Sequence, residues 1–187
     1  MLDIALIPQT YSIATSSEIF DLCLTERLGE AVKKHDGLPL LHLSLHGNTQ
    51  GIQFTNDESL NWNQLRLKLL PLIRGMNGNL IICMSSCFGA SGCRMAMHHD
   101  NEPTFSALIG NNTEMEVSDA ALAYATFYSL LFKGKRIDDC VKAMCISAGN
   151  SNFDVLYGQQ TKQDYIKFLK QQSAVQLQNA VSGAVIF

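Results

Sequence analysis

Two short stretches of the sequence combine residue types that could carry out nucleophilic catalysis. His46 and Gly47 follow the apolar run 38–45, and Cys87 follows the apolar run 80–84 after two serines. A cysteine thiolate is a strong nucleophile, and a histidine within about 4 Å can take up the thiol proton and later protonate a leaving amine. The two stretches therefore predict a Cys87–His46 dyad, provided that the fold brings them together.

Both runs are typical of strands that are buried on two faces, as in a parallel sheet. The carboxyl ends of neighbouring parallel strands meet at one edge of the sheet, which is where ligands bind in open α/β folds. Small residues surround Cys87 and predict a tight loop that exposes it. The alternative for Cys87 is the role of most free cysteines, a small apolar residue in the core. His42, on the same strand as His46, is expected to be a structural histidine with a satisfied hydrogen bond.

The remaining elements alternate between strand and helix. Apolar periodicity predicts helices that begin near Ser17, near Trp62 and at Ser118 or Asp119, and another that begins near residue 137. Strands are expected over 3–8, 38–45, 80–84, 105–109 and 153–157. This order predicts an α/β fold of three layers, a mostly parallel central sheet with helices on both faces. We expect a single domain over 1–187, in which 160–187 form a helical C-terminal extension.

The composition describes a compact globular protein. Hydrophobic residues make up 47% of the 187 residues and charged residues 17%, and the net charge is −3. A weakly acidic chain has no general attraction for nucleic acid or for anionic membranes, so neither is expected as a partner. The six cysteines form no C-x-x-C pair, and the N-terminus lacks the features of a signal peptide. We therefore expect a cytoplasmic protein with free thiols.

The order of these motifs resembles a known family. A strand followed by His46-Gly47, then a hairpin, a helix and a strand that ends at Cys87 is similar to the caspase-like cysteine peptidases, and closest to the CHAT-domain branch related to separase. Val117-Ser-Asp119 and Val155-Leu-Tyr-Gly158 extend the resemblance over roughly residues 38 to 158. It implies a caspase-like fold with His46 as base and Cys87 as nucleophile. The backbone amides of Gly47 and Cys87 would form the oxyanion hole, and no cofactor is implied.

The sequence departs from this family around the cysteine. The run after Cys87 is Phe88-Gly-Ala-Ser-Gly92, where many CHAT domains have one residue and then Ser-Gly or Thr-Gly. The Gln-Ala-Cys signature of caspases is absent, so specificity for aspartate is not implied.

The residues around the expected site favour a basic side chain in the substrate. Val-Ser-Asp119 resembles the Val-Thr-Asp of separase, which cleaves after arginine. An acidic group in a pocket selects Arg or Lys through charge-assisted hydrogen bonds. We expect Asp119, Glu116 and Ser86 to contact the substrate. The alternative is that Ser118 or Asp119 only caps the helix that follows.

These expectations together describe an endopeptidase that cuts a protein or peptide substrate at a limited site, after Arg or Lys. The family's common setting is bacterial defence or cell death. An activating partner and a homodimer through an edge strand near Phe153 stay open beside a monomer. The main alternative is a catalytically silent caspase-like scaffold or binding module. Two others are less favoured, a zinc site and a phosphate-binding loop, because the expected spacings are missing; their residues would be Cys83, Cys87, Cys93, His98 and His99 for zinc, and Gly89 and Gly92 for phosphate.

Overall fold

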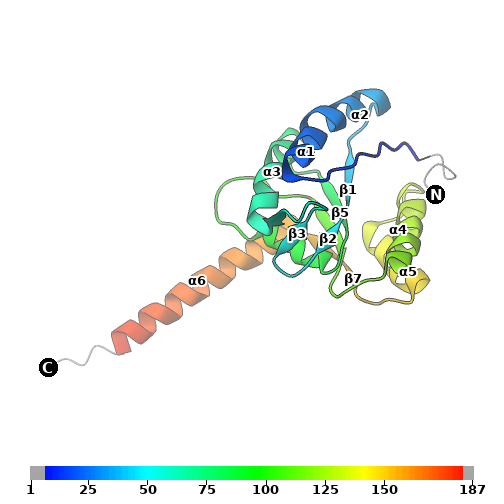
Figure 1. The fold of residues 1–187 in the computed structure, drawn as a ribbon. Helices are drawn as coiled ribbons and strands as arrows, with labels where there is room; N and C mark the ends of the chain where they lie inside the picture. Colours follow the sequence, from blue (N-terminus) through cyan, green and yellow to red (C-terminus); the bar gives the residue numbers. More distant parts are fainter. Residues whose placement is uncertain (1–6, 183–187) are drawn as a thin grey trace.

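The central feature of the protein is a four-stranded sheet with the order β1-β5-β6-β7. The computed structural model describes residues 7–182, with side chains over 7–176. β1 (Leu40–Ser44), β5 (Ile81–Ser85) and β6 (Ala107–Asn111) are parallel, and β7 (Phe153–Tyr157) runs antiparallel to β6 at one edge (Figure 1). The prediction of a mostly parallel central sheet is therefore confirmed.

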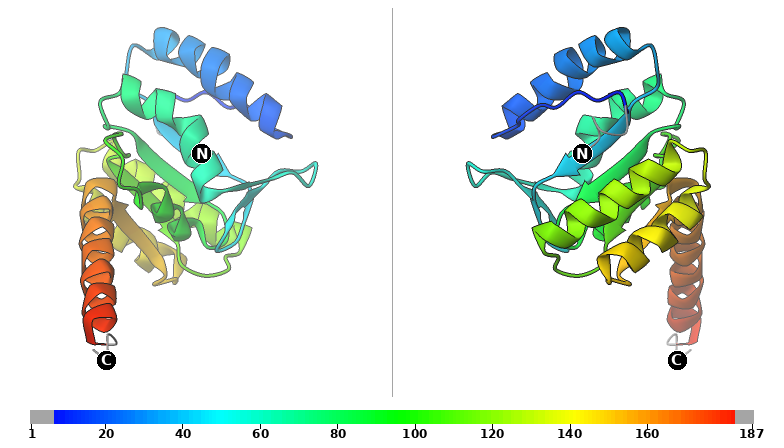
Figure 2. Two further views of the ribbon diagram at one scale, coloured as in Figure 1. Left: turned by 90° about the vertical axis from the view of Figure 1, so that its left-hand side faces the viewer. Right: turned by 90° about the vertical axis from the view of Figure 1, so that its right-hand side faces the viewer.

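Helices cover both faces of this sheet. α1 (Ser17–Leu22), α2 (Leu28–His35) and α3 (Trp62–Gly75) lie on one side, and α4 (Val117–Leu131) and α5 (Ile137–Ala148) lie on the other (Figures 1 and 2). The short 3₁₀ helix η3 (Gly89–Ala96) follows β5 and contributes Met95 to the same side as α3. The three-layer α/β architecture is confirmed.

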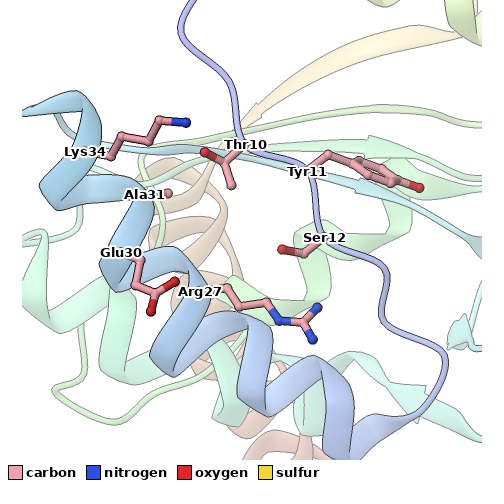
Figure 3. Close-up of a pocket in the computed structure, with 7 residues that line it drawn as sticks. All are labelled: Thr10, Tyr11, Ser12, Arg27, Glu30, Ala31 and Lys34. Atoms are coloured by element: carbon pink, nitrogen blue, oxygen red, sulfur yellow. The ribbon is translucent and has the colours of Figure 1, made fainter.

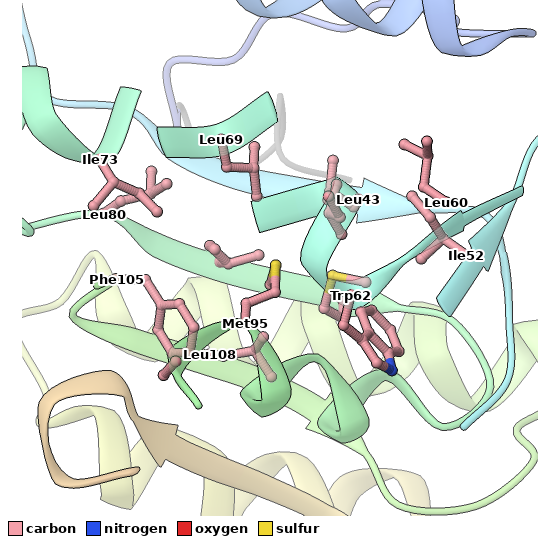
Figure 4. Packing of buried hydrophobic residues seen from close by; sticks show 14 of the residues in the cluster. Leu43, Ile52, Leu60, Trp62, Leu69, Ile73, Leu80, Met95, Phe105 and Leu108 are labelled. Carbon is pink, nitrogen blue, oxygen red and sulfur yellow. The ribbon is translucent and has the colours of Figure 1, made fainter. Parts of the chain in front are cut away.

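The alternation of side chains along each strand divides the core into two clusters. On β5, Ile82 and Met84 pack with α3, whereas Cys83 points to the opposite face and packs with α4 and α5. On β6, Leu108 belongs to the α3 side and Ile109 to the α4 side. Figure 4 shows the α3 side, where Trp62, Leu69 and Phe105 meet the strand residues. Burial on both faces explains why these strands read as continuous apolar runs.

The first helical segment is continuous from Ser17 to His35, with a π-helical stretch η2 (Cys23–Arg27) between α1 and α2. Ser16 caps it, because its Oγ accepts a hydrogen bond from the backbone N–H of Ile19 at 3.2 Å. We expected Gly37 to take the left-handed conformation at the end of this helix. That was wrong, since Asp36 takes it with φ 47°; aspartate tolerates this region better than most residues.

A small antiparallel sheet projects from the end of β1. It consists of β2 (His46–Gly47), β3 (Gly51–Gln53) and β4 (Ser59–Asn61) in that order. The hairpin between β2 and β3 forms because the Asn48 side chain accepts hydrogen bonds from the N–H groups of Gln50 and Gly51. β4 was not predicted, because three residues with one buried side chain carry too little periodicity.

Two further expectations about elements changed. α3 begins with a capping box between Asn61 and Gln64 and runs unbroken through Pro71, where we expected a kink or a restart. The strand expected over 3–8 lies mostly outside the described residues. Ile7 and Pro8, the two that are described, are not in a strand, although Ile7 is buried in the α4 side of the core.

The C-terminal helix α6 (Gly158–Ser182) starts two residues before the expected extension and projects away from the body (Figure 1). Its first turns are anchored by Lys162, whose Nζ donates to the backbone carbonyls of Asp100 and Glu102, each at 2.7 Å. Tyr165 and Leu169 are half-buried, whereas Phe168 is exposed. Among the described residues, no helix has the length and apolarity that crossing a bilayer requires.

The first prediction tests the α3 layer of the core. Leu65 and Leu67 lie on the same helix with exposed fractions of 0% and 54%. Leu65→Ala is expected to lower the free energy of unfolding by about 3–5 kcal/mol, because it removes buried methyl groups and leaves a cavity. Leu67→Ala, the matched control, is expected to change it by less than about 0.5 kcal/mol. Urea unfolding measures both; equal losses would contradict the orientation of α3.

Candidate active site

The pairing of β1 with β5 brings His46 and Cys87 to one edge of the sheet. In the parallel register Leu43 pairs with Met84, and Ser44 pairs with Ser85. His46 lies two residues beyond Ser44, and Cys87 lies two residues beyond Ser85. The two chains therefore leave the sheet side by side, at the same level and in the same direction.

Gly47 makes a close backbone contact with the cysteine loop. A Cβ atom at Gly47 would lie 2.7 Å from the carbonyl oxygen of Cys87 and 3.0 Å from Cβ of Ser86. Such distances exclude any side chain, so glycine is required here for close approach. The contact joins the residue after His46 to Cys87 itself, so that the two predicted catalytic residues belong to one site.

Two backbone N–H groups are available at this edge. Asn48 donates to the carbonyl of Gly51 at 3.0 Å, and hydrogen-bonded and non-hydrogen-bonded pairs alternate in an antiparallel ladder. The next pair, Gly47 with Ile52, is therefore a non-hydrogen-bonded one, and the N–H of Gly47 points away from β3. The N–H of Cys87 donates to no other residue in the described part of the chain. Two such donors are what an oxyanion hole needs.

The loop that carries Cys87 turns sharply. Phe88 adopts the left-handed conformation with φ 54° and ψ 25°, which costs a residue with a large side chain about 1–2 kcal/mol. Gly89 donates from its backbone N–H to the carbonyl of Ser86 at 3.1 Å and closes the turn. Cys87, half-buried at its tip, lies with Sγ 3.9 Å from the carbonyl oxygen of Met115. Backbone strain of this kind is concentrated at functional sites.

The neighbouring strand holds this loop in place through a residue that the sequence did not point to. Asn111, at the end of β6, is fully buried, and its Oδ1 accepts hydrogen bonds from the N–H and the hydroxyl of Thr113, both at 2.8 Å. The carbonyl of Thr113 in turn accepts from the N–H of Phe88 at 2.9 Å. A signal for Asn111 was present in the sequence, because it is a polar residue that ends an apolar strand beside the one that leads to Cys87.

Ser86 lies beneath the loop. It is 3% exposed, and its Oγ is 3.1 Å from the positions that a Cβ would take at Gly47 and at Gly89. The hydroxyl has no hydrogen-bond partner in the described part of the protein. We expected Ser86 to contact the substrate; its position instead fills the space between two glycines that approach it closely.

The predicted acidic residues lie on the segment that touches Cys87. The contact of Met115 with Sγ places the start of α4 beside the cysteine. Asp119 is half-buried in the first turn of α4, and Glu116 is exposed. The expected helix cap was wrong: α4 begins at Val117, and Glu116 occupies the N-cap position without a side-chain hydrogen bond, so neither Ser118 nor Asp119 is the cap.

His42 has a structural environment, as expected. Its Nδ1 lies 2.5 Å from the hydroxyl oxygen of Tyr128, and its ring meets that of Tyr124 edge-on, with centroids 4.7 Å apart. Part of the residue remains exposed at the sheet edge, but burial of the ring lowers the pKa of His42 to about 4. His42 is therefore neutral at pH 7 and is held by α4, on the side chain's own face of β1.

The other cysteines differ from Cys87 in environment. All six are free thiols. Burial raises the pKa of Cys83 to about 12, and burial also raises the pKa of Cys93, Cys140 and Cys145. A raised pKa disfavours the reactive thiolate.

The residues weighed for zinc are spread over different surroundings. Cys83 packs on the α4 side of the sheet, and Nδ1 of His98 lies 2.6 Å from an Oδ of Asp100. Within residues 7–182, no group of three His, Cys, Asp or Glu side chains is placed to hold a metal ion.

Comparison of the sequence with models of known protein families and with curated proteins finds no match. The function therefore has to be argued from the site itself.

The contact of Gly47 with the cysteine loop generates the second prediction. Gly47→Ala is expected to lower the free energy of unfolding by about 1–3 kcal/mol, because the added Cβ would overlap the Cys87 carbonyl and displace the loop. Gly29→Ala is the control: Gly29 lies in α2 with nothing within 4 Å, and alanine there is expected to raise stability by about 0.5–1 kcal/mol. Urea unfolding tests both. A neutral Gly47→Ala variant would show that the two loops are not in contact.

Proposed function

We propose that the protein is a cysteine endopeptidase of the caspase-like class, in which Cys87 is the nucleophile and His46 the general base. The observation that carries this proposal is the register of β1 and β5. It places both residues the same distance beyond one pair of neighbouring strands, and Gly47 contacts Cys87. A nucleophile, a base and two free backbone donors at one sheet edge are the parts that acyl transfer needs.

In the proposed reaction, His46 accepts the proton of the Cys87 thiol, and the thiolate attacks the carbonyl carbon of the scissile peptide bond. The negative charge that develops on the carbonyl oxygen is held by the N–H groups of Gly47 and Cys87. When the C–N bond breaks, the imidazolium gives its proton to the leaving amine and a thioester remains. His46 then takes a proton from water, the resulting hydroxide adds to the thioester, and the thiol is released with a carboxylate product.

We further propose that the substrate is a protein partner cut at a limited site, after Arg or Lys. Asp119 supports this, since it is half-buried at the start of the helix beside Cys87 and is hydrogen-bonded to no other described residue. A carboxylate in that state can pair with a basic side chain, and a guanidinium would be bound more tightly than an ammonium because it can donate two parallel hydrogen bonds.

The proposed setting is the cytoplasm, where free cysteines persist. Bacterial defence or cell death is the process in which we propose that the cleavage takes part, and an activating partner and a homodimer are compatible with it. Neither nucleic acid nor a membrane is part of the proposal. The second candidate is a catalytically silent scaffold of the same fold; the exposed position of His46 and the lack of a side-chain partner for it in the described residues favour it.

Labelling of the active thiol tests the proposal directly. A peptidyl acyloxymethyl ketone with arginine next to the reactive group is expected to modify Cys87, because only a thiolate activated by a base reacts quickly with this electrophile. Cys87→Ala should abolish labelling and His46→Ala should slow it by roughly a hundredfold or more, within the range for general-base catalysis. Mass spectrometry of tryptic fragments identifies the labelled residue.

Cys93→Ala is the matched control for this experiment, since Cys93 is a half-buried free thiol in the next helical segment. It should label at the wild-type rate. Labelling that is absent from the folded wild-type protein with every peptidyl electrophile tried, basic or not, would favour the scaffold.

Substrate choice provides a separate prediction. Asp119→Asn is expected to lower kcat/KM for a peptide with arginine at the cleavage position by about tenfold or more, because a charge-assisted hydrogen bond is lost, and to leave the value for a glutamine peptide nearly unchanged. Glu116→Gln, an exposed neighbour that also loses one charge, should have little effect on either peptide. Cleavage only after aspartate or after apolar residues would contradict the role of Asp119.

A further inference from the structure

A pocket lies between the N-terminal segment and the first helical layer, where the segment 10–12 crosses α2 and the π-helical stretch η2. Its volume is about 390 Å³. One wall carries the hydroxyl groups of Thr10 and Ser12, and the other carries Arg27, Glu30 and Lys34 (Figure 3). It belongs to the α1–α2 layer, to which neither His46 nor Cys87 contributes.

The segment that forms the outer wall is fastened on both sides of the pocket. Oγ1 of Thr10 is hydrogen-bonded to Nε2 of His35 at 3.2 Å. At the other end, the Sγ of Cys23 donates to the carbonyl of Ile13 at 3.9 Å. The pocket therefore has two walls that are held relative to each other, and it is not a gap beside a free strand of chain.

Arg27 is oriented before any ligand arrives. Its Nη1 donates to the Sγ of Cys23 at 3.6 Å, the same sulfur that joins the outer wall. A guanidinium has five N–H donors in a planar fork, so most of them remain available. Arg27 is also the last residue of η2, and π-helical turns within longer helices are frequent at functional sites. A half-buried, pre-oriented guanidinium is well suited to phosphate.

The charges in the pocket are arranged in a row. Arg27 and Lys34 are seven residues apart, which is roughly 10 Å along a helix. Figure 3 shows them at opposite ends of the pocket, with Glu30 and the small side chain of Ala31 between them. Within the described chain, neither base forms an ion pair with Glu30. Two cations separated by an acceptor would match a ligand that is anionic at both ends and carries hydroxyl groups in the middle.

We propose that this pocket binds a small polyol with a phosphate group at each end, of the sugar bisphosphate class. Arg27 and the hydroxyl of Ser12 hold one phosphate, and Lys34 and the hydroxyl of Thr10 hold the other. Glu30 accepts hydrogen bonds from the hydroxyl groups of the spacer and disfavours a ligand whose negative charge is concentrated at the centre. The site is a second, regulatory or sensory one, and it stands independently of the proposed peptidase activity.

Isothermal titration calorimetry of the full chain tests the assignment with three probes. Fructose 1,6-bisphosphate has two phosphates and a hydroxyl-bearing spacer, fructose 6-phosphate has one phosphate, and pyrophosphate has two phosphate groups without a spacer. We expect the bisphosphate to bind at least about tenfold more tightly than either of the others, since only it reaches both cations and Glu30. Equal affinity for the three probes, or no heat of binding for the bisphosphate at millimolar concentration, would overturn the proposal.

Variants locate the binding. Arg27→Ala and Lys34→Ala should each weaken bisphosphate binding by about tenfold or more, and Arg27→Lys should restore only part of it, because the forked geometry is lost. Lys33→Ala is the matched control, since Lys33 is exposed on the same helix and does not line the pocket. Circular dichroism confirms that each variant is folded. If Lys33→Ala weakens binding as much as Lys34→Ala does, attraction to the general surface charge explains it and the pocket is excluded.

Discussion

The parallel pairing of β1 with β5 is the constraint on which the candidate site depends. A parallel register repeats at each residue along both strands, so one pair such as Ser44 with Ser85 determines where everything beyond it emerges. His46 and Cys87 are adjacent for that reason alone, although 40 residues separate them in the sequence. A shift of the register by one residue would also have turned Met84 and Cys83 to the wrong faces, so the packing of both core clusters protects the geometry of the site.

Close backbone contacts then convert proximity into a defined arrangement. Gly47 approaches the Cys87 carbonyl, Gly89 approaches Met84, and Gly110 approaches the backbone of Gly89 and Ala90. Three segments meet here with almost no side chains between them. This leaves the loop little freedom, and the hydrogen bonds from Asn111 through Thr113 to Phe88 hold it in a strained turn. The stability of the central strands is therefore used at the site, where it offsets the cost of an exposed and strained cysteine loop.

The two faces of the sheet serve different purposes. The α4 side contributes the aromatic cluster around Tyr124 and Tyr128, which holds His42 neutral and contains Cys83. It also delivers the start of α4, with Asp119, to the cysteine. The opposite side carries the α1–α2 helix and its polar pocket. A ligand there would contact the protein through a different layer from a peptide at Cys87, and α3 lies between that helix and the sheet (Figure 1).

The sequence alone determined the class of fold and the two residues at the centre of the site. The apolar runs before His46 and Cys87 are local signals, and burial on both faces leaves no other reading of their composition. Only the tertiary structure decided the rest. The role of Asn111, the left-handed turn at Phe88 and the burial of Ser86 depend on which strands are neighbours and in which register, and these follow from long-range packing. Local propensity could not place the cap of α4 at Glu116 or the helix end at Asp36, because the free energies involved are small beside those of packing.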